Sequence, residues 1–437
     1  MGTSRMQPRR AMARTAVKSV VDTIRRHKPD YHIILYMGLL MLLGLIVIYA
    51  IGPQRANFLN SLEGTDFNDS FFFIKQAISL LAALGMFALM ATIPYKIISK
   101  YAAKILIAGF GACALLVILG NVFDLSQLAL CTKGACRWFI IPGLGTIQPA
   151  ELLKFGILVF TASFLGLRMQ QGLINDRDKT LIPLGAMLGL AVLFVIVLQK
   201  DMGTGISLVA ILLTMLVAAG MKWKLIGMAI ATIGIAGLML VVTAPHRLER
   251  VATYFQGDSA PADNDESHHI NQAKIAIGSG GLFGLGIGNS VQASGYLPEA
   301  INDSVFAVMG ETFGFIGLVI ILALFTGLLL RLLKIYDHLG PPELRLVVAG
   351  VFGWLGSHVM LNVAAMIGLV PLTGITLPLL SFGGTSMVFI VGALGLAFQL
   401  SRYTSHRVNK ETDNEDSRSR RGVGRTRYAS GRGSSRI

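Results

Sequence analysis

The fold is decided by the stretch SVFAVMGETFGFIGLVIILALFTGLLLRLL, residues 304–333, in which Glu311 is the only charged residue before Arg331. A helix needs about 20 mainly apolar residues to cross the hydrocarbon core of a bilayer. This run exceeds that length, so it predicts a membrane-spanning helix that is tilted or projects beyond the bilayer. An acid within such a run is costly, and it must pair with a cation, be protonated or line a wet cavity.

Similar runs occur along most of the chain. The 437 residues are 53% apolar and 14% charged, with a mean hydropathy of +0.64, which is typical of a polytopic membrane protein. Ten candidate spans lie at roughly 31–51, 72–94, 102–123, 151–168, 181–199, 203–221, 225–244, 304–333, 346–370 and 377–401. The sequence therefore predicts an all-α integral membrane protein with ten transmembrane helices.

The longest connection, 245–303, lies between the seventh and eighth predicted helices, and we expect it to be an extracellular loop. Long loops in compact proteins are usually functional or disordered. Its Gly-rich part, 268–290, fits no nucleotide-binding glycine spacing. We expect that part to be an interfacial or re-entrant piece whose backbone packs closely on the membrane domain.

Lysine and arginine residues predict the orientation in the membrane. They concentrate in the N-terminal segment 1–30, in alternate short loops and in the Arg/Ser/Gly-rich tail 403–437, as is typical of cytoplasmic flanks. We expect both termini to be cytoplasmic and the tail to be disordered, either solvated or docked on a partner. The net charge of +14 could suggest nucleic acid, but topology and anionic lipids explain it, so no nucleic-acid partner is predicted.

The cysteine and histidine residues indicate no metal site. Cys113 lies in an apolar run and is expected to pack there. Cys131 and Cys136 share an outer loop where a disulfide could persist, and the sequence leaves their oxidation state open. His268 and His269 are adjacent, so their side chains point apart in regular structure.

Charged residues at the outer ends of the spans are candidate functional groups. Glu151 and Lys154 lie three residues apart and therefore on one helix face, either as a local ion pair or as part of a functional cluster with Arg137. Asp201 lies in the short turn LQKDMGTG. It either caps the following helix or belongs to the same site.

Three acids lead into the 304–333 run. Asp303 is either a helix cap or a catalytic acid, and no Glu or Gln follows three residues later to complete a capping box. Glu311 would lie about 12 Å deeper along a helix. We expect it to form a structural ion pair with a cation such as Lys75 or Lys154. Glu299 is expected to shape the loop or its rim.

Several sequence blocks occur together in the order, and near the membrane positions, found in one protein family. They are RWFIIPGLGTIQPAELLK, DMGTGISL, RLERVATYF, NQAKIAIGSGGLFGLGIGNSVQASGYLPEAINDSVFAVMGETFGFIG and LPLLSFGGTSM. Over residues 31–402 the chain resembles the FtsW/RodA (SEDS) family, and GNSVQASGYLPEA is more similar to its division branch than to its elongation branch.

The resemblance implies a ten-span glycosyltransferase of the bacterial plasma membrane. Such a protein polymerises lipid II into peptidoglycan on the outer face and releases undecaprenyl diphosphate. The resemblance also implies a class B penicillin-binding protein transpeptidase as partner, together with other membrane proteins of the divisome at the division septum. No cofactor is implied with certainty, and a divalent cation (Mg²⁺ or Mn²⁺) stays open.

The same resemblance implies roles for individual residues. The essential aspartate of the family falls on Asp303, which would act as the general base for the acceptor hydroxyl. The implied substrate-binding residues are Arg137, Glu151, Lys154, Asp201, Arg247, Arg250, Gln272, Glu299 and Ser381. The cations among them would meet the departing diphosphate, with Arg preferred for bidentate contacts. Inversion at the sugar suits a direct displacement with one base.

The chain departs from the family pattern near the implied base. Ile301-Asn302-Asp303 stands where the family commonly has His-Thr-Asp, and Lys200 replaces the usual proline before Asp201. Three alternatives stay open: a flippase or transporter for the same lipid, in which acids and cations within the spans would matter most, an elongation or sporulation paralogue, and a scaffold that only activates a partner synthase.

Overall fold

The computed structural model of the protein describes residues 28–125, 127–132, 135–141, 145–242 and 265–404. These described residues form one compact unit. The predictions for the N-terminal segment up to residue 27, the tail from 405, and Arg247 and Arg250 lie outside the described residues.

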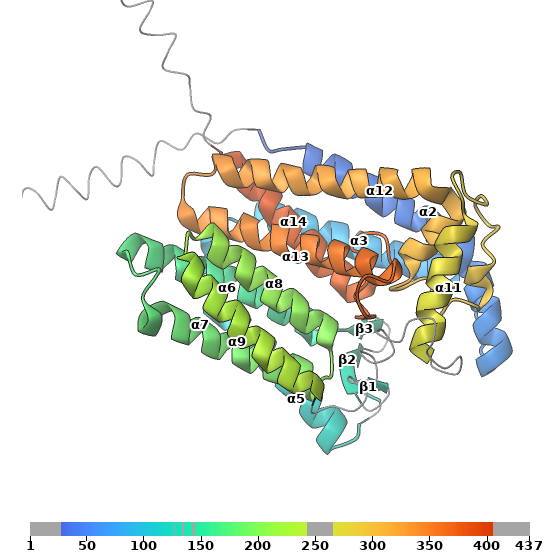
Figure 1. Cartoon of the computed structure of the whole chain (residues 1–437), viewed down its shortest axis with the longest axis horizontal. Coiled ribbons are helices and arrows are strands. Elements are labelled where there is room, and N and C mark those ends of the chain that lie inside the picture. Colours follow the sequence, from blue (N-terminus) through green and yellow to red (C-terminus); the bar gives the residue numbers. More distant parts are fainter. Residues whose placement is uncertain (1–27, 126, 133–134, 142–144, 243–264, 405–437) are drawn as a thin grey trace, which may run out of the picture. The chain divides into compact units, whose positions relative to one another are not determined.

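Helices make up most of the described chain (Figure 1). The α-helices are α2 (His32–Glu63), α3 (Phe71–Thr92), α4 (Tyr95–Lys100), α5 (Ala102–Val117), α6 (Pro149–Gln171), α7 (Ile182–Val192), α8 (Met202–Ala218), α9 (Trp223–Val242), α11 (Asp265–Ser279), α12 (Val305–His338), α13 (Pro342–Met366) and α14 (Gly384–Leu400). Short helical turns are η1 (Ile118–Val122), η2 (Arg177–Leu181), η3 (Leu193–Leu198), η5 (Gln292–Ser294) and η6 (Ser401–Tyr403).

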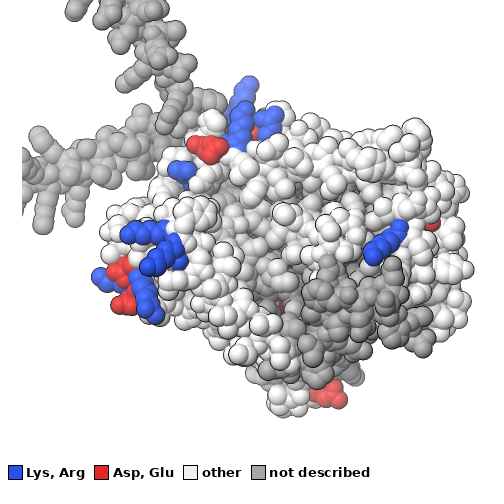
Figure 2. Space-filling model, viewed as in Figure 1, with Lys and Arg blue, Asp and Glu red and all other residues white. Residues whose placement is uncertain are grey.

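Eight helical segments of the described chain are long and apolar enough to cross a membrane, and α8 and α9 are shorter apolar helices. Each of the ten predicted spans therefore coincides with a helix, whereas a count of ten membrane crossings stays a prediction. On the face that Figure 2 shows, most visible lysine and arginine side chains lie toward the upper and left-hand side, and the broad middle carries almost no charge. A broad uncharged surface beside a side rich in lysine and arginine is typical of a protein that spans a bilayer.

A small β-sheet departs from the predicted all-α fold. Strands β1 (Ala129–Thr132), β2 (Ala135–Ile141) and β3 (Gly145–Ile147) form an antiparallel sheet in the order β1-β2-β3. Cys131 lies opposite Cys136 in the β1–β2 ladder, and the two form a disulfide. The cross-link that the sequence left open is therefore present, and β3 leads directly into α6.

The centre of the bundle is formed by α6, α13 and α14. In each of their apolar windows 72% of the residues are buried, against 22% in α3, which presents most of its surface outward. Figure 1 shows α8 running beside α6 and α13, and α14 packs along α3. The candidate acids and cations of α6 therefore lie inside the bundle.

A pair of glycines sets the contact between α5 and α6. A Cβ on Gly109 would lie 2.8 Å from the Cα of Leu153, and one on Gly156 would lie 2.9 Å from the Cα of Leu106. Both distances are below van der Waals contact, so only glycine lets the two backbones approach this closely, as small residues do in membrane helix pairs.

The first helix is longer than predicted. The sequence predicts an end near residue 51, but α2 continues through Pro53 to Glu63. Ala56 is fully buried. The Gln54 amide donates a hydrogen bond to the Gly288 carbonyl (3.1 Å). The polar end of α2 is therefore held by a contact with a segment more than 200 residues away in the sequence. Local periodicity cannot reveal such a contact.

The Gly-rich segment before α12 joins its backbone to a break in that helix. Gly314, inside α12, has φ 68° and ψ −171°, which opens the helical hydrogen-bond ladder. The freed backbone groups pair with the segment 281–286: Phe315 N–H donates to the Gly281 carbonyl and Leu285 N–H to the Glu311 carbonyl, both at 2.9 Å. The close backbone packing expected for the segment 268–290 is confirmed.

Candidate active site

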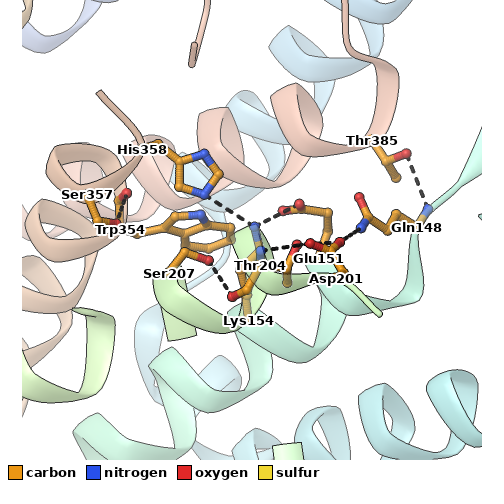
Figure 3. Close-up of polar contacts among 10 residues, drawn as sticks. All are labelled: Gln148, Glu151, Lys154, Asp201, Thr204, Ser207, Trp354, Ser357, His358 and Thr385. Carbon is orange, nitrogen blue, oxygen red and sulfur yellow. Dashed lines mark hydrogen bonds and ion pairs between the residues drawn. The ribbon is translucent and has the colours of Figure 1, made fainter. Parts of the chain in front are cut away.

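Glu151 and Lys154 form an ion pair inside the bundle. Both are on the first turns of α6, with 2.7 Å between Glu151 Oε1 and Lys154 Nζ, and their side chains are 3% and 0% exposed. The same ammonium lies 3.4 Å from His358 Nε2 and 5.1 Å from the centre of a Trp354 ring, both on α13 (Figure 3). The local pair is therefore confirmed, and Lys154 has no exposed surface through which a diphosphate could reach it.

Asp201 caps α8. Its Oδ1 accepts the Thr204 backbone N–H (2.9 Å), and its Oδ2 accepts the Thr204 hydroxyl and the Gln148 amide, both at 2.9 Å. The capping alternative is confirmed, because an N-cap carboxylate satisfies the free N–H groups at a helix start. Gln148 immediately precedes α6, so this network also joins the starts of α6 and α8 (Figure 3).

Arg137, on β2, contacts the turn before α8. Its guanidinium donates to the backbone carbonyls of Gln199 (3.2 Å) and Lys200 (2.7 Å). Arg137 is half-buried and Lys200 is exposed. The sheet therefore holds a partly accessible guanidinium at the rim of the α6–α8 cluster.

A second site lies at the start of α12, in the turn from Pro298 to Ser304. Backbone N–H groups of Asn302 and Ser304 donate to the Glu299 carbonyl, at 2.9 and 3.3 Å. The Asn362 amide, on α13, donates to the carbonyls of Asp303 (2.6 Å) and Ile375 (2.7 Å). The turn is therefore tied both to itself and to α13.

The Asp303 side chain is half-buried, and its Oδ1 is buried without a hydrogen-bond partner. Burial, reinforced by the nearby Glu299 carboxylate, raises the pKa of Asp303 to about 7. The N-cap residue of α12 is Ser304, so the capping alternative for Asp303 is wrong. A carboxylate with one unpaired oxygen and a pKa near neutrality is suited to proton transfer.

The expected ion pair of Glu311 with Lys75 or Lys154 is wrong. Glu311, although 1% exposed, accepts hydrogen bonds from the Ser290 hydroxyl (2.5 Å) and from the Val291 N–H (3.1 Å). The Gln292 N–H donates to it as well. Lys75 is exposed and lies over the Phe71 ring instead. Backbone N–H groups therefore stabilise this buried acid in place of a cation.

Three other predicted binding residues lie apart from the Lys154 ion pair. Ser381 is 3% exposed, and its hydroxyl accepts the Leu377 N–H (2.8 Å), which closes the turn before α14. Gln272 is half-buried on α11. Glu299 is exposed, has φ 50° and accepts a hydrogen bond from the Asn302 amide, so it shapes the turn as expected.

Three polar residues contact these sites although sequence reasoning gave them no role there. His358 and Asn362 are four residues apart on α13, so one helix face reaches both the Lys154 pair and the Asp303 turn. His269, on α11, contacts Ser304 beside Asp303 (2.5 Å). The signal that could have found the first two is the spacing of polar residues in HVMLN within an apolar run.

No group of three or more His, Cys, Asp or Glu side chains within the described ranges could hold a metal ion. The divalent cation therefore stays a prediction. The polar groups that the structure does bring together are a buried, fully enclosed ion pair and an acid with one unpaired oxygen, and the two are linked by α13.

The chain matches known proteins over most of its length. A family model for FtsW, RodA and SpoVE, described as cell cycle protein, matches residues 30–406. Stage V sporulation protein E of Bacillus subtilis (strain 168) is 32% identical over 392 residues, which cover 88% of this chain and 100% of that protein. The probable peptidoglycan glycosyltransferase FtsW of Nitrosomonas europaea is 31% identical over 381 residues, with 85% and 92% coverage.

Solved structures share the fold. A chain from a peptidoglycan synthase complex, which coordinates polymerisation and crosslinking, superposes with a TM-score of 0.64 at 23% identity over 86% of this chain and 98% of that chain. The rod shape determining protein RodA of Thermus thermophilus superposes with a TM-score of 0.58 at 22% identity, with the same coverage. The resemblance predicted from the sequence blocks is confirmed, and the chain belongs to the FtsW/RodA/SpoVE family.

Proposed function

We propose that the protein is a peptidoglycan glycosyltransferase that polymerises lipid II, with Asp303 as the general base. The observation that carries the proposal is the Asp303 carboxylate: it is half-buried, one oxygen has no hydrogen-bond partner, and its pKa is about 7. A base is most effective when its pKa lies near the working pH. Relatives named probable peptidoglycan glycosyltransferase supply the reaction class.

The proposed reaction is a single displacement. Asp303 removes the proton of the acceptor sugar hydroxyl while that oxygen bonds to the anomeric carbon of the donor. The bond between this carbon and the diphosphate oxygen breaks, and the electron pair leaves with undecaprenyl diphosphate. Because the diphosphate is already a good leaving group, the protein needs to supply only a base and positive charge.

The structure distinguishes between the cations that could supply this positive charge. Lys154 is enclosed and paired with Glu151, so we assign it to the scaffold. Arg137 is half-buried at the rim. Its guanidinium can keep its two backbone contacts and still offer further N–H donors to a phosphate. Arg137 is therefore the proposed diphosphate contact among the described residues, and Arg247 and Arg250 stay predictions.

We place this activity at the outer face of the plasma membrane, with both termini cytoplasmic. The gathering of most visible lysine and arginine side chains on one side of the molecule supports the orientation (Figure 2). Similarity to a chain of a synthase complex that couples polymerisation to crosslinking supports a penicillin-binding protein transpeptidase as partner. We assign the chain to septal synthesis, and a sporulation or elongation role is the alternative, because a sporulation protein and FtsW proteins match at similar identity.

The test is polymer formation by the purified protein from lipid II, with and without a class B transpeptidase. We expect glycan polymer from the wild-type protein and none from Asp303→Asn or Asp303→Ala. Asp69→Asn is the matched control, because it removes an exposed carboxylate from the loop between α2 and α3. Polymer formation at the wild-type rate by a folded Asp303→Asn protein would contradict the assignment of the base.

A lipid transporter is the second candidate. The observation that favours it is the enclosed Glu151–Lys154 pair beside His358, because ionisable groups within spans often mark transport pathways. Vesicles that contain the pure protein and labelled lipid II separate the two functions. Translocation of lipid II without polymer would favour the transporter, and polymer without translocation would favour the transferase.

A further inference from the structure

The turn that carries Asp303 is fixed through the side chain of its neighbour, Ser304. The Ser304 hydroxyl is fully buried and lies 2.9 Å from the Pro298 carbonyl and 2.5 Å from His269 Nε2. Pro298 is at the other end of the turn, and His269 is on α11. One hydroxyl therefore joins both ends of the turn to a separate helix.

One arrangement of donors and acceptors satisfies both contacts of the Ser304 hydroxyl, with Pro298 and with His269. A carbonyl can only accept, so the single Ser304 hydroxyl proton goes to Pro298. The imidazole must then donate its Nε2–H to the Ser304 oxygen. Burial, together with the neighbouring His268, lowers the pKa of His269 to about 4, while the Glu299 charge opposes this shift. His269 is therefore a neutral donor at neutral pH.

We propose that His269 is a positioning residue for Asp303 and acts through the Ser304 hydroxyl. His269 is only 9% exposed. The positioning role does not require contact with a substrate. It fixes the side of the turn that faces α11, whereas Asn362 fixes the Asp303 carbonyl from α13. This inference rests on the proposed function, because it assigns a role to His269 in the same reaction.

The contact between His269 and Ser304 affects the position of Asp303 and the access of solvent to its carboxylate. A general base must lie within hydrogen-bond reach of the proton that it removes, and a displacement of about 1 Å can cost about 100-fold in rate. Loss of the His269 contact frees one side of the turn and lets water reach the Asp303 carboxylate. Hydration of a buried carboxylate moves its pKa back toward its ordinary value.

The experiment compares three variants of His269 in the polymerisation assay with the full-length protein. His269→Ala removes the donor, and we expect kcat to fall about 10- to 100-fold with little change in KM. The acid limb of the His269→Ala profile, which is the low-pH range where activity falls as pH drops, should move to lower pH. His269→Gln places an amide N–H close to the position of Nε2 and should restore most of the activity, whereas the shorter His269→Asn should not.

His268→Ala is the matched control, because His268 is the exposed neighbour on the same helix and should keep wild-type kcat and pH profile. Ser304→Ala removes the acceptor of the same hydrogen bond. The double variant His269→Ala/Ser304→Ala should therefore be no slower than the slower single variant, because residues in one contact are not additive.

Two results would overturn the positioning role while leaving the base assignment intact. One is an inactive Asp303→Asn protein beside a His269→Ala protein with wild-type kcat and acid limb. The other is equal activity of the Gln and Asn variants, which would show that the donor position is irrelevant even if His269→Ala fails to fold. An active Asp303→Asn protein would instead overturn the proposed function.

Discussion

Two charged residues at apolar positions, Lys154 and Asp303, have opposite environments in the folded protein. Lys154 is paired with Glu151 at 2.7 Å and is enclosed by His358 and Trp354. Asp303 keeps a buried oxygen without a partner. A paired charge is stabilised in its ionised form, whereas an unpaired buried acid holds its proton more tightly. At the scale of the residue, these environments support the proposal that Asp303 is the reactive group and Lys154 a structural one.

The raised pKa of Asp303 predicts the pH dependence of activity. A base acts only when deprotonated, so the polymerisation rate should fall as pH drops through about 7. Glu299→Gln removes the neighbouring negative charge that raises this pKa, so its acid limb should move to lower pH. The measurement is kcat/KM between about pH 5 and 9. An acid limb at the same pH in both proteins would contradict the assignment.

The same pKa predicts an opposite trend in stability. The folded protein holds the Asp303 proton more tightly than the unfolded chain does, so this residue stabilises the fold at low pH. That stabilisation is complete below the ordinary pKa of 3.8 and is lost as pH rises from there through about 7. Asp303→Asn mimics the protonated acid, so it should melt at a higher temperature than the wild type at pH 8, and this difference should be smaller at pH 5. The reverse order would show that the carboxylate is stabilised in its charged form.

Because Glu151 and Lys154 form a buried ion pair on α6, we expect a substitution of Lys154 to destabilise the protein and a second substitution, of Glu151, to restore stability. Lys154→Met leaves Glu151 as an unpaired charge in the bundle, and breaking a buried pair costs about 3–5 kcal/mol. The double variant Glu151→Gln/Lys154→Met removes both charges and should recover most of the loss. Lys75→Met, at an exposed position, is the control. Thermal unfolding in detergent measures all three, and a stable Lys154→Met protein would contradict the structural role.

At the scale of the element, α13 connects the two sites. Trp354, His358 and Asn362 follow at four-residue spacing and so share one face of α13. Trp354 and His358 contact the Lys154 ammonium, and Asn362 contacts the Asp303 turn. The helices at the ten predicted spans could be predicted from their apolar runs, because that signal is local. The polar contacts of α13 with Lys154 and Asp303 could not, because each joins residues that are distant in the sequence. The β-sheet was not predicted, and its three strands are short and lie between two helices.

The close approach of α5 and α6 predicts a contrast between two glycines of one helix. Gly109→Ala would force a Cβ against the Leu153 backbone and should destabilise the protein by about 1–3 kcal/mol. Gly111 faces open space, so Gly111→Ala should be neutral or stabilising by up to about 1 kcal/mol. Melting temperatures of the two variants provide the comparison. Equal losses would show that α5 and α6 do not pack through this glycine.

At the scale of the whole molecule, the chain combines a packed helical centre with a Gly-rich segment before α12 that is hydrogen-bonded to that helix. Glu311 illustrates the limit of sequence reasoning. Its depth in an apolar run indicated a partner, but the partners are the Ser290 hydroxyl and the backbone N–H groups of Val291 and Gln292. Asp201 illustrates the reverse, because a cap at a helix start is a local interaction that the sequence does indicate. The family blocks located Asp303, and the fold supplied its environment.

The most direct test of the account is to measure substrate binding and polymer formation on the same sample of Asp303→Asn protein. The account predicts that lipid II binds with an affinity within a few-fold of wild type while glycan polymer is absent, because the carboxylate acts in the chemical step. Polymer formation at the wild-type rate by this variant would contradict the central claim that Asp303 is the general base.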